Sequence, residues 1–527
     1  MEEIYLLGVD VGTSSIKVTV IDQEARFVAQ ESAAYRLINP NQVSIQIDTA
    51  DMWNAFTGCV GALISKHGVE PGKIKAIGIS SLCPGLAAFD ADGRVLVDPI
   101  IYSDRRSTEE AEIFRQTIGN QRLFEITANS PMAGAMSGTS MLWIKRNLPE
   151  IYEKTRYFGH VNTLIAVMLS GNFAIDHSNA SYTLLYETAG RGVWSEEICG
   201  KIGIDIHKLP PLVKSTDVVG NLIHPVLLAM GLSPETKIVI GGGDTACATL
   251  AAGVVKQGDV CESVGTTNVL TVCVEEPKFS PNFINRRHVV DGAWIYQGAM
   301  SHTGSSYQWI YDNFYQDYKD YPSVTGKQGM MLMNDDAEQA EPGADGLVFL
   351  PYMMGERSPV WDPYARGVFF GLSLKTTRRE MNRAVLEGCA YGLRQLIEMV
   401  EKVTGQKLIK FSSIGGGAKS KVWAQIKADI TGRDITVLDM NDMAPVGAAL
   451  LAGVGIGVFK DVYEASAKVE KSVYMEIRHS DAYKEVYDRR YQVYTGLYPS
   501  VKELYKVNLG VQYRSRMIKR SKRSNLR

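Results

Sequence analysis

Cysteine is scarce in this chain and never clustered. The 527 residues include seven cysteines, with no Cys-x-x-Cys pair and no cysteine–histidine group at the spacing of a zinc site. This pattern argues against a structural zinc module, and reduced thiols in the cytoplasm are its simplest interpretation. The seven residues are Cys59, Cys83, Cys199, Cys247, Cys261, Cys273 and Cys389.

Long apolar runs and a strong charge imbalance are missing as well. No apolar segment reaches the length of a membrane span, and the start at Met1-Glu2-Glu3 lacks the basic and then apolar regions of a signal peptide. The net charge of -2 gives no general reason to expect a polyanionic partner. We therefore expect a cytoplasmic protein that binds neither membranes nor nucleic acid.

A Walker A phosphate loop is also absent. The stretch from Gly68 to Lys73 approaches the pattern but has the wrong spacing and no Ser or Thr after the lysine. A basic C-terminal segment, residues 513–527, is the one local excess of charge, and we interpret it as a solvated or frayed tail rather than a polyanion site.

What the chain does contain is an ordinary globular composition, with 45% hydrophobic and 22% charged residues. At this length a single hydrophobic core is too small, so two or more domains are expected. Short apolar runs alternate with segments of helical periodicity, which predicts an α/β protein.

The strongest local signal lies at residues 238–248. Ile238 to Ile240 predict a buried strand, Gly241 to Gly243 allow a sharp turn close to a ligand, and the small residues that follow suit a tightly packed helix. Asp244 is thereby placed at a strand-to-helix corner, where the helix dipole favours its ionised form and leaves it able to accept a proton. The competing interpretation is that Asp244 only caps the helix.

Two strand–turn–strand units carry glycine and hydroxyl residues in their turns. In the first, Asp10 closes a strand, the turn holds Gly12, Thr13 and Ser14, and Lys17 follows. Backbone N–H groups of such a turn can bind phosphate, and an acid beside it suits a Mg²⁺. The second unit has Gly265, Thr266 and Thr267 between two strands. Two such turns would let two halves of the protein hold one polyphosphate. The competing interpretation is that these turns bind no ligand, since similar turns are common in proteins without one.

Further polar turns and loops follow other predicted strands. Gly304 lies in a small polar turn before a helix, and a Gly-rich corner before the helix at 420–430 suits a nucleotide. Asp104 and Arg106 follow a strand, where a surface ion pair and a ligand site are equally good interpretations. Residues 316–341 are largely polar and are predicted to be a mobile connection, whereas Thr377 to Glu380 has capping-box spacing before a helix that ends near Gly405.

Together these motifs resemble the FGGY family of carbohydrate kinases, over residues 4–457. The most specific match to that family is Gly367 to Leu372 together with Glu380 to Gly388, whereas its N-terminal signature fits at Trp143 but has Ser140 where lysine is usual. The resemblance implies an α/β fold of two actin-like (ribonuclease H-like) domains flanking an interdomain cleft. The domains would span residues 1–245 and 246–460, followed by a helical extension at 461–527.

The resemblance also implies roles for particular residues. Asp244 matches the catalytic base, Asp10 the metal-binding acid, and Asp104 and Arg106 the pair beside the sugar. The residues that would bind ATP are Gly12, Thr13, Ser14, Lys17, Gly265, Thr266, Thr267, Gly304, Gly415, Gly416, Gly417 and Lys419. The residues that would bind the sugar are Cys83, Pro84, Gly85, Asp104, Arg106, Asp244 and Thr245.

Within the family, residues 351–367 look most like xylulose kinases, with gluconate kinases next. Xylulose kinases usually carry Met-His-Gly at a sugar contact where this chain has Cys83-Pro84-Gly85, so the sugar itself is left open. The expected activity is ATP- and Mg²⁺-dependent phosphorylation of a sugar or polyol, such as D-xylulose or gluconate, by a possible homodimer. The alternative is an actin-like ATPase that hydrolyses ATP as a conformational switch.

Overall fold

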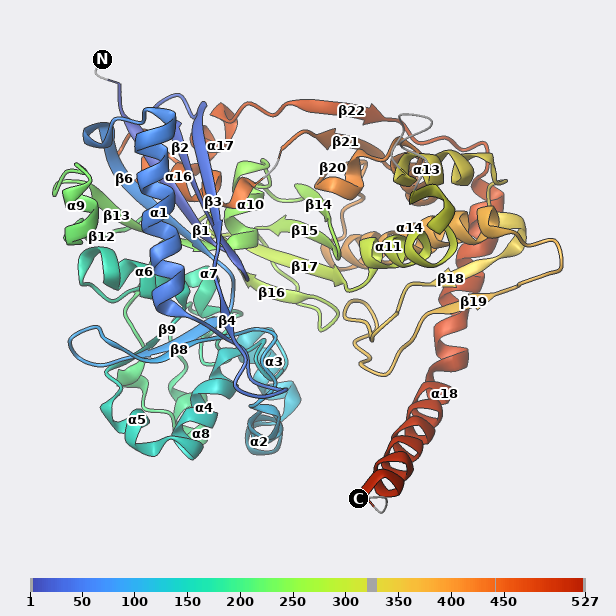
Figure 1. Ribbon diagram of the computed structural model, residues 1–527, viewed down its shortest axis with the longest axis horizontal. Coiled ribbons are helices and arrows are strands. Elements are labelled where there is room, and N and C mark those ends of the chain that lie inside the picture. The colour runs from blue at the N-terminus through green and yellow to red at the C-terminus, as the bar shows by residue number, and fades with distance from the viewer. Residues whose placement is uncertain (1–2, 320–328, 441, 525–527) are drawn as a thin grey trace. The chain divides into compact units, whose positions relative to one another are not determined.

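The computed structural model describes residues 3–319, 329–440 and 442–524, and the chain folds into two compact units (Figure 1). Unit 1 comprises Met1–Asp259, Val272–Tyr296 and Met440–Lys471, and unit 2 comprises Val260–Thr271, Gln297–Asp439 and Ser472–Arg527. Each unit is therefore assembled from separate stretches of the chain. The three family domains expected at 1–245, 246–460 and 461–527 are a division by sequence alone and stay a prediction.

The main sheet of unit 1 contains the predicted N-terminal hairpin. β1 and β2 pair in antiparallel fashion, and β1 pairs with β6 in parallel, as β6 does with β13. The apolar runs that predicted these strands are buried, which matches the near-continuous hydrophobicity of strands covered on both faces. In spatial order the strands are β12 (Val218–Asn221), β13 (Lys237–Gly243), β6 (Ile74–Ser81), β1 (Tyr5–Val11), β2 (Ser15–Asp22) and β3 (Phe27–Ala34).

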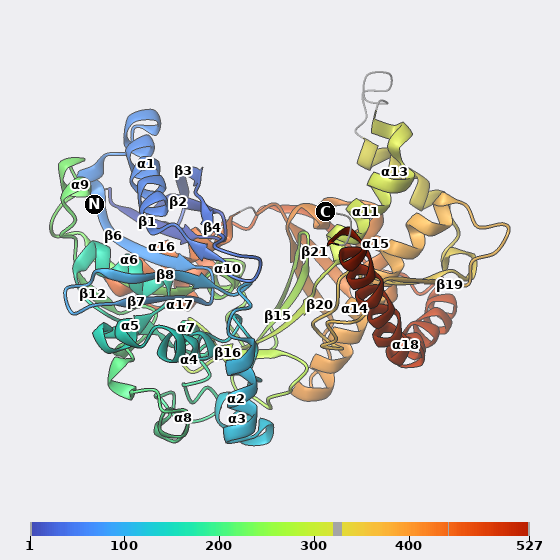
Figure 2. The ribbon, with the colours of Figure 1, turned by 60° about the horizontal axis from the view of Figure 1, so that its bottom comes forward.

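Two helices cover the opposite faces of this sheet. α1 (Thr49–His67) packs on the face that carries Leu7 and Val9, and it lies along β2 and β3 in Figures 1 and 2. α16 (Met443–Gly455) packs on the other face, which carries Gly8 of β1 and Gly78 of β6. Because side chains alternate along a strand, Asp10 is placed on the same face as Gly8.

α16 approaches the sheet as closely as two backbones can. A Cβ on Gly8 would lie 1.7 Å from the carbonyl oxygen of Pro445, and one on Gly78 would lie 1.9 Å from that of Ala448. On its other side, Gly447 makes the same kind of contact with Cys247 of α10 (Asp244–Ala251). The predicted small-residue helix therefore fixes α10, and with it the Asp244 corner, against the sheet.

The remaining elements of unit 1 surround this core. A second sheet has the order β4 (Leu37–Ile38), β5 (Gln46–Ile47), β8 (Val95–Ile101), β7 (Gly85–Phe89) and β9 (Tyr157–Gly159). β10 (Ile175–Asp176) pairs with β11 (Leu212–Val213), and β16 spans Ile284–Arg287. The other helices are α2 (Thr108–Ile118), α3 (Asn120–Thr127), α4 (Ser137–Asn147), α5 (Pro149–Lys154), α6 (Val161–Ser170), α7 (His177–Ala180), α8 (Glu196–Ile202), α9 (Pro225–Ala229) and α17 (Val462–Lys468).

Unit 2 has its own sheet, in which the second predicted strand–turn–strand unit forms β14 and β15. The seven strands of the sheet follow the order β16, β17 (Trp294–Met300), β15 (Asn268–Val274), β14 (Val260–Val264), β20 (Lys410–Ile414), β21 (Asp434–Leu438) and β22 (Val473–Ile477). A small antiparallel pair joins β18 (Val348–Leu350) to β19 (Val368–Phe370). The helices are α11 (Thr303–Phe314), α13 (Gly329–Gln339), α14 (Arg378–Thr404), α15 (Lys421–Thr431) and α18 (Lys484–Ser524).

The helices of unit 2 include one confirmed and one wrong prediction. α14 begins with the predicted capping box of Thr377 and Glu380 and ends at Gly405 with positive φ. The mobile connection predicted at residues 316–341 is wrong for 329–339, which form α13; its Met333 and Ala337 are buried, so a few apolar residues suffice to pack a largely polar segment. Residues 320–328 lie outside the described part of the chain.

The C-terminal segment interpreted as a solvated or frayed tail continues α18 as helical backbone through Ser524, and residues 525–527 lie outside the description. Among the described residues, we find no helix that combines the length and the apolar character needed to cross a membrane.

Candidate active site

Asp244 lies where the sequence predicted it, at the corner between β13 and α10. The N-cap of α10 is Gly243, so capping does not explain the acid. Its Oδ1 accepts hydrogen bonds from the backbone N–H of Thr245 (2.5 Å) and from Thr245 Oγ1 (3.1 Å). These described contacts use only Oδ1, which leaves Oδ2 for a ligand.

Two of the three glycines before Asp244 lie where a side chain would clash with neighbouring atoms. Gly241 has a φ of 63°, and a Cβ there would lie 1.8 Å from the carbonyl oxygen of Ile79 in β6. A Cβ on Gly243 would lie 3.2 Å from Nη1 of Arg286 and 3.4 Å from Cβ of Cys83. The glycines thus bring the strand, an arginine and the Cys83 loop together at the base of Asp244.

The electrostatic surroundings of Asp244 differ from the simple helix-dipole expectation. Burial raises the pKa of its carboxyl above the ordinary value, while the Arg286 guanidinium and the hydrogen bonds from Thr245 oppose that rise. A raised pKa makes the carboxylate a stronger proton acceptor, which is the property that a general base requires.

Asp10 lies near Asp244 in the same unit. Its Oδ1 accepts a hydrogen bond from Ser80 Oγ (2.7 Å), its parallel neighbour in β6. Burial, followed by the charge of Asp244, raises the pKa of Asp10 to about 7. Two carboxylates that are buried close together favour a cation between them and a ligand, because a cation offsets the charge that burial penalises.

The first glycine turn holds its hydroxyls at the surface. Ser14 is exposed and Thr13 is half-buried, with Thr13 Oγ1 3.3 Å from the Tyr102 hydroxyl. The Tyr35 hydroxyl donates to the Gly12 carbonyl and so stiffens the turn. Lys17, predicted to contact phosphate, pairs instead with Asp442, the residue that precedes α16.

Asp104 and Arg106 form a buried ion pair, so the surface-pair interpretation is wrong. The distance from Asp104 Oδ2 to Arg106 Nη2 is 2.8 Å, and the two side chains are 0% and 9% exposed. Asp104 also accepts from the backbone N–H of Ile45 (2.7 Å), and the guanidinium lies over the ring of Trp143 (5.1 Å). This pair anchors the loop after β8, and a role in binding sugar stays a prediction.

The Cys83-Pro84-Gly85 loop precedes β7 and contains a cis peptide bond at Pro84. Cys83 Sγ lies 3.8 Å from Nδ1 of His160, so an imidazole does lie beside this loop although it comes from a different part of the chain. Both ring nitrogens of His160 have protein partners, Ser137 Oγ at 2.8 Å and Asn179 Oδ1 at 3.2 Å, and burial lowers its pKa to about 4. The ring is therefore neutral and already occupied.

The predicted nucleotide loops at Gly265, Gly304 and Gly415 lie against one another in unit 2. A Cβ on Gly304 would lie 2.0 Å from the carbonyl oxygen of Gly265, which places the start of α11 directly against the second turn. Gly415 has a φ of 94°, and a Cβ there would lie 2.6 Å from the carbonyl oxygen of Val264, just before the same turn. Gly265 and Thr266 are exposed, but the backbone N–H of Gly265 donates to the Thr267 carbonyl within the turn (2.9 Å).

The remaining residues of the loop from Gly415 to Lys419 differ in how closely other atoms surround them. A Cβ on Gly416 would meet no atom within 4 Å, whereas one on Gly417 would clash with Val264 Cγ1 at 2.6 Å. Lys419 pairs with Asp439 (2.6 Å) rather than extending over the glycines.

A buried charged network, which the sequence did not predict, holds the strands on either side of the turn at residues 265–267. Glu262 accepts from Asn268 Nδ2, Ser413 Oγ and Lys427 Nζ, each at 2.6 Å, and the Glu262 and Lys427 side chains are 0% and 1% exposed. Since Glu262 and Asn268 flank residues 265–267, the network fixes both ends of the turn. Its only sequence signal is a carboxylate within an otherwise apolar strand.

The structure thus gathers the candidates of each unit separately. In unit 1, Asp244 lies near Asp10, Cys83 and the missed residues Arg286 and Asp176. Convergence of these groups with the loops of unit 2 on one cleft stays a prediction. In the described chain, we find no group of three or more His, Cys, Asp or Glu residues that could hold a metal by itself.

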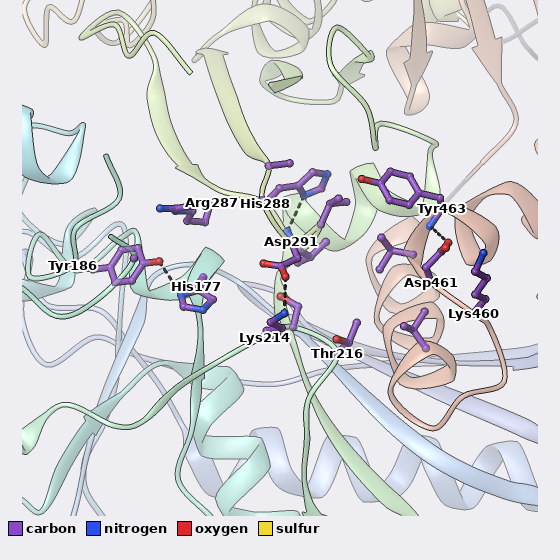
Figure 3. Close-up of a pocket in the computed structure, with 18 of the residues that line it drawn as sticks. His177, Tyr186, Lys214, Thr216, Arg287, His288, Asp291, Lys460, Asp461 and Tyr463 are labelled. Carbon is purple, nitrogen blue, oxygen red and sulfur yellow. Dashed lines mark hydrogen bonds and ion pairs between the residues drawn. The ribbon is translucent and has the colours of Figure 1, made fainter. Parts of the chain in front are cut away.

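A separate pocket of about 390 Å³ opens elsewhere in unit 1 and includes none of the predicted site residues (Figure 3). Its lining includes Arg287, His288 and Asp291, and the last of these pairs with Lys214 at 2.6 Å. His177 Nδ1 and the Tyr186 hydroxyl, 2.7 Å apart, lie on the same side of the pocket as Arg287, and Tyr463 lies on the other side. Because its lining contains none of the predicted site residues, this pocket is not the candidate active site.

Comparison with known proteins agrees with this geometry. Residues 5–251 match the model of the FGGY family of carbohydrate kinases, N-terminal domain, and residues 261–456 match that of its C-terminal domain. The chain is 30% identical to a xylulose kinase of Bacillus subtilis over 498 residues (93% of this chain and 97% of that protein) and 27% identical to a gluconokinase of the same organism over 482 residues (91% and 93%).

Solved structures give the same result for the fold. The crystal structure of xylulose kinase from Rhodospirillum rubrum superimposes with a TM-score of 0.86 at 25% identity, and it covers 95% of this chain and 100% of that one. The chain thus has the two-domain actin-like (ribonuclease H-like) α/β fold. It belongs to the FGGY family of carbohydrate kinases.

Proposed function

We propose that this kinase transfers the γ-phosphoryl group of ATP to a hydroxyl of a ketopentose such as D-xylulose, with Asp244 as the general base. The observation that supports this best is the Asp244 corner, where burial raises the pKa of an acid that keeps Oδ2 available. Asp244 would accept the hydroxyl proton while the oxygen attacks the phosphorus in line. The remaining catalytic contribution is positioning and charge stabilisation.

Asp10 fits the role of a Mg²⁺ ligand. It supplies a carboxylate with one oxygen bound to Ser80, and Mg²⁺ in kinases is held by one or two carboxylates together with substrate phosphates and water. A bound Mg²⁺ would offset the charge of the phosphate oxygens. The raised pKa of Asp10 supports this role, because a nearby cation would favour the ionised form.

The glycine and hydroxyl loops would hold the nucleotide. Thr13 and Ser14 in unit 1 and Thr266 and Thr267 in unit 2 would donate to phosphate oxygens. Gly12 and Gly265 would let the phosphate approach the backbone, because their own N–H groups donate to the Ser15 and Thr267 carbonyls (both 2.9 Å). Gly415, Gly416 and Gly417 would leave room for the adenosine, beside Gly304. Lys17 and Lys419 are weaker candidates, because each is paired with an aspartate.

The identity of the sugar rests on the names of the relatives, which are xylulose kinases and gluconokinases. A coupled assay of ADP release against D-xylulose, L-ribulose, gluconate, glycerol and erythritol tests it. We expect ADP release that depends on one of these acceptors and is strongest with D-xylulose. ADP release at the same rate with and without every acceptor would instead support an ATPase switch.

Two further expectations belong to this proposal. We place the kinase in the cytoplasm, which is consistent with seven free cysteines and no disulfide among the described residues. A homodimer is the expected assembly, and light scattering of the purified chain measures it directly.

A further inference from the structure

Arg286 is a buried residue that the mechanism above does not use. It lies in β16, its side chain is among the largest in the described chain that are less than 2% exposed, and its Nε and Nη2 have no hydrogen-bond partner among the described residues. Neighbouring Asn285 fixes the strand, since its backbone N–H and C=O both bond to the Asn129 amide (3.1 and 2.7 Å). The backbone that carries the unpartnered guanidinium is therefore firmly held.

The guanidinium lies at the base of the Asp244 corner. Its Nη1 would lie 3.2 Å from a Cβ on Gly243, and its carbon lies 5.4 Å from the centre of the Tyr182 ring. The ionisable groups that act on its charge are Tyr182, Cys83, Asp244 and Asp176. Two of these, Cys83 and Asp244, are already candidates for contact with the sugar.

Asp176 does not supply the missing acceptors. Its Oδ1 accepts from Asn162 Nδ2 (2.9 Å) and Asn179 Nδ2 (2.7 Å), and its Oδ2 accepts from the hydroxyl and backbone N–H of Ser178. Both oxygens are thus saturated by groups other than Arg286. Asp176 therefore balances part of the charge of Arg286 without accepting its hydrogen bonds.

Buried N–H groups of a charged side chain are almost always paired in folded proteins, since leaving them unpaired is costly. A buried site that keeps two such donors beside a candidate base is prepared for a ligand that brings its own acceptors. We propose that Arg286 binds the phosphoryl acceptor, by donating from Nε and Nη2 to two adjacent oxygens of the sugar. The planar fork of a guanidinium suits such an oxygen pair.

This inference rests on the proposed kinase function and makes its substrate recognition specific. Arg286 would supply a charged donor pair at the loop where the chain has Cys83 and Pro84. The oxygen pair could be a carbonyl and hydroxyl of a ketopentose or the carboxylate of a sugar acid. The charge balance of the corner, with Asp244 and Asp176 against Arg286, favours a neutral acceptor.

Steady-state kinetics of the full-length chain tests the assignment. Arg286→Lys keeps the charge but loses the fork, and Arg286→Gln loses both. We expect the KM for the acceptor to rise at least tenfold in both variants while the KM for ATP changes less than twofold. Both variants are assayed with D-xylulose and with gluconate as acceptor. The acceptor whose KM rises more identifies which oxygen pair Arg286 binds.

Arg287 provides the matched control. It is adjacent in sequence, but its side chain donates to the Gly190 carbonyl (2.8 Å), lies over Trp294 and lines the separate pocket (Figure 3). Arg287→Gln should leave the KM of the acceptor unchanged. Added guanidinium chloride at millimolar concentration should partly restore the KM of Arg286→Gln and not alter the control.

An unchanged acceptor KM in folded Arg286→Lys and Arg286→Gln would overturn the inference. If neither variant folds, a crystal structure of the wild-type chain with its acceptor decides, since an acceptor oxygen should lie within hydrogen-bond distance of Nε or Nη2. A wild-type chain that phosphorylates no acceptor would instead refute the proposed function, so the two failures are distinguishable.

Discussion

The two glycine–hydroxyl turns have the same design but opposite electrostatic surroundings. The turn after β1 follows Asp10, whose carboxylate forms no ion pair among the described residues, although the charge of Lys17 acts on it, and whose pKa is raised to about 7. The turn after β14 follows Glu262, whose charge is neutralised by the buried Lys427. The first turn is therefore suited to hold a cation, and the second offers only neutral donors on a rigid base.

The largest effect on stability should come from removing the buried ion pair between Lys427 and Glu262 that supports the second turn. Lys427→Met leaves Glu262 buried and without its counter-charge, which should lower the free energy of unfolding by about 3–5 kcal/mol. Urea unfolding measures the change. The double variant Glu262→Gln with Lys427→Met should recover most of the loss, and equal stability of the single and double variants would contradict the charge argument.

The second effect lies in unit 1 and concerns chemistry rather than stability. Asp244→Asn should reduce kcat at least about a hundredfold, since the amide cannot accept the hydroxyl proton, while ATP affinity stays nearly intact. Initial rates and nucleotide titration measure the two quantities. Asp291→Asn, which removes a carboxylate paired with the exposed Lys214, is the control, and full activity of Asp244→Asn would remove Asp244 from the role of base.

A pair of glycine substitutions compares the two turns directly. Gly304→Ala would place a Cβ 2.0 Å from the Gly265 carbonyl oxygen, so the second turn must shift at a cost of about 1–3 kcal/mol. We expect a rise of about tenfold in the KM for ATP. Gly12→Ala would place its Cβ 3.1 Å from the Ser15 carbonyl oxygen, and its cost should stay below about 1 kcal/mol. Equal effects would mean that rigidity does not distinguish the turns.

The last comparison is a pH dependence in unit 2. Glu356 accepts from the backbone N–H groups of Ser301 and Arg357 (2.6 and 2.7 Å), yet burial raises its pKa to about 7. Between the unfolded-state pKa of about 4.3 and that value, the folded state holds a proton that the unfolded state has lost. Stability therefore falls as pH rises through this window, by up to about 1.4 kcal/mol per unit.

Glu356→Gln removes this titration. The difference in unfolding free energy between variant and wild type should shift in favour of the variant from pH 5 to pH 7 and level off above it. Denaturant unfolding at several pH values measures this difference, and a constant difference across the range would show that Glu356 titrates normally in the folded state.

Local patterns predicted most of the elements on which this comparison depends. Alternating and continuous apolar runs marked both strand–turn–strand units, and glycines marked the Asp244 corner, because these signals act over a few residues. α13 escaped prediction because four of its apolar residues, Met330 to Met333, are consecutive rather than spaced at helical intervals. The Lys427–Glu262 pair and the Arg286 donors escaped it because their surroundings come from residues distant in the sequence, such as Cys83 and Asp176 beside Arg286.

The packing of α16 against β1 and β6 has a consequence for biosynthesis. The helix comes from residues 443–455, whereas the strands that it covers lie within the first 81 residues. A ribosome must therefore synthesise most of the polypeptide before that side of the N-terminal sheet can be covered. Until then the nascent chain presents an apolar surface suited to chaperones, and premature termination before residue 443 would leave that surface permanently open.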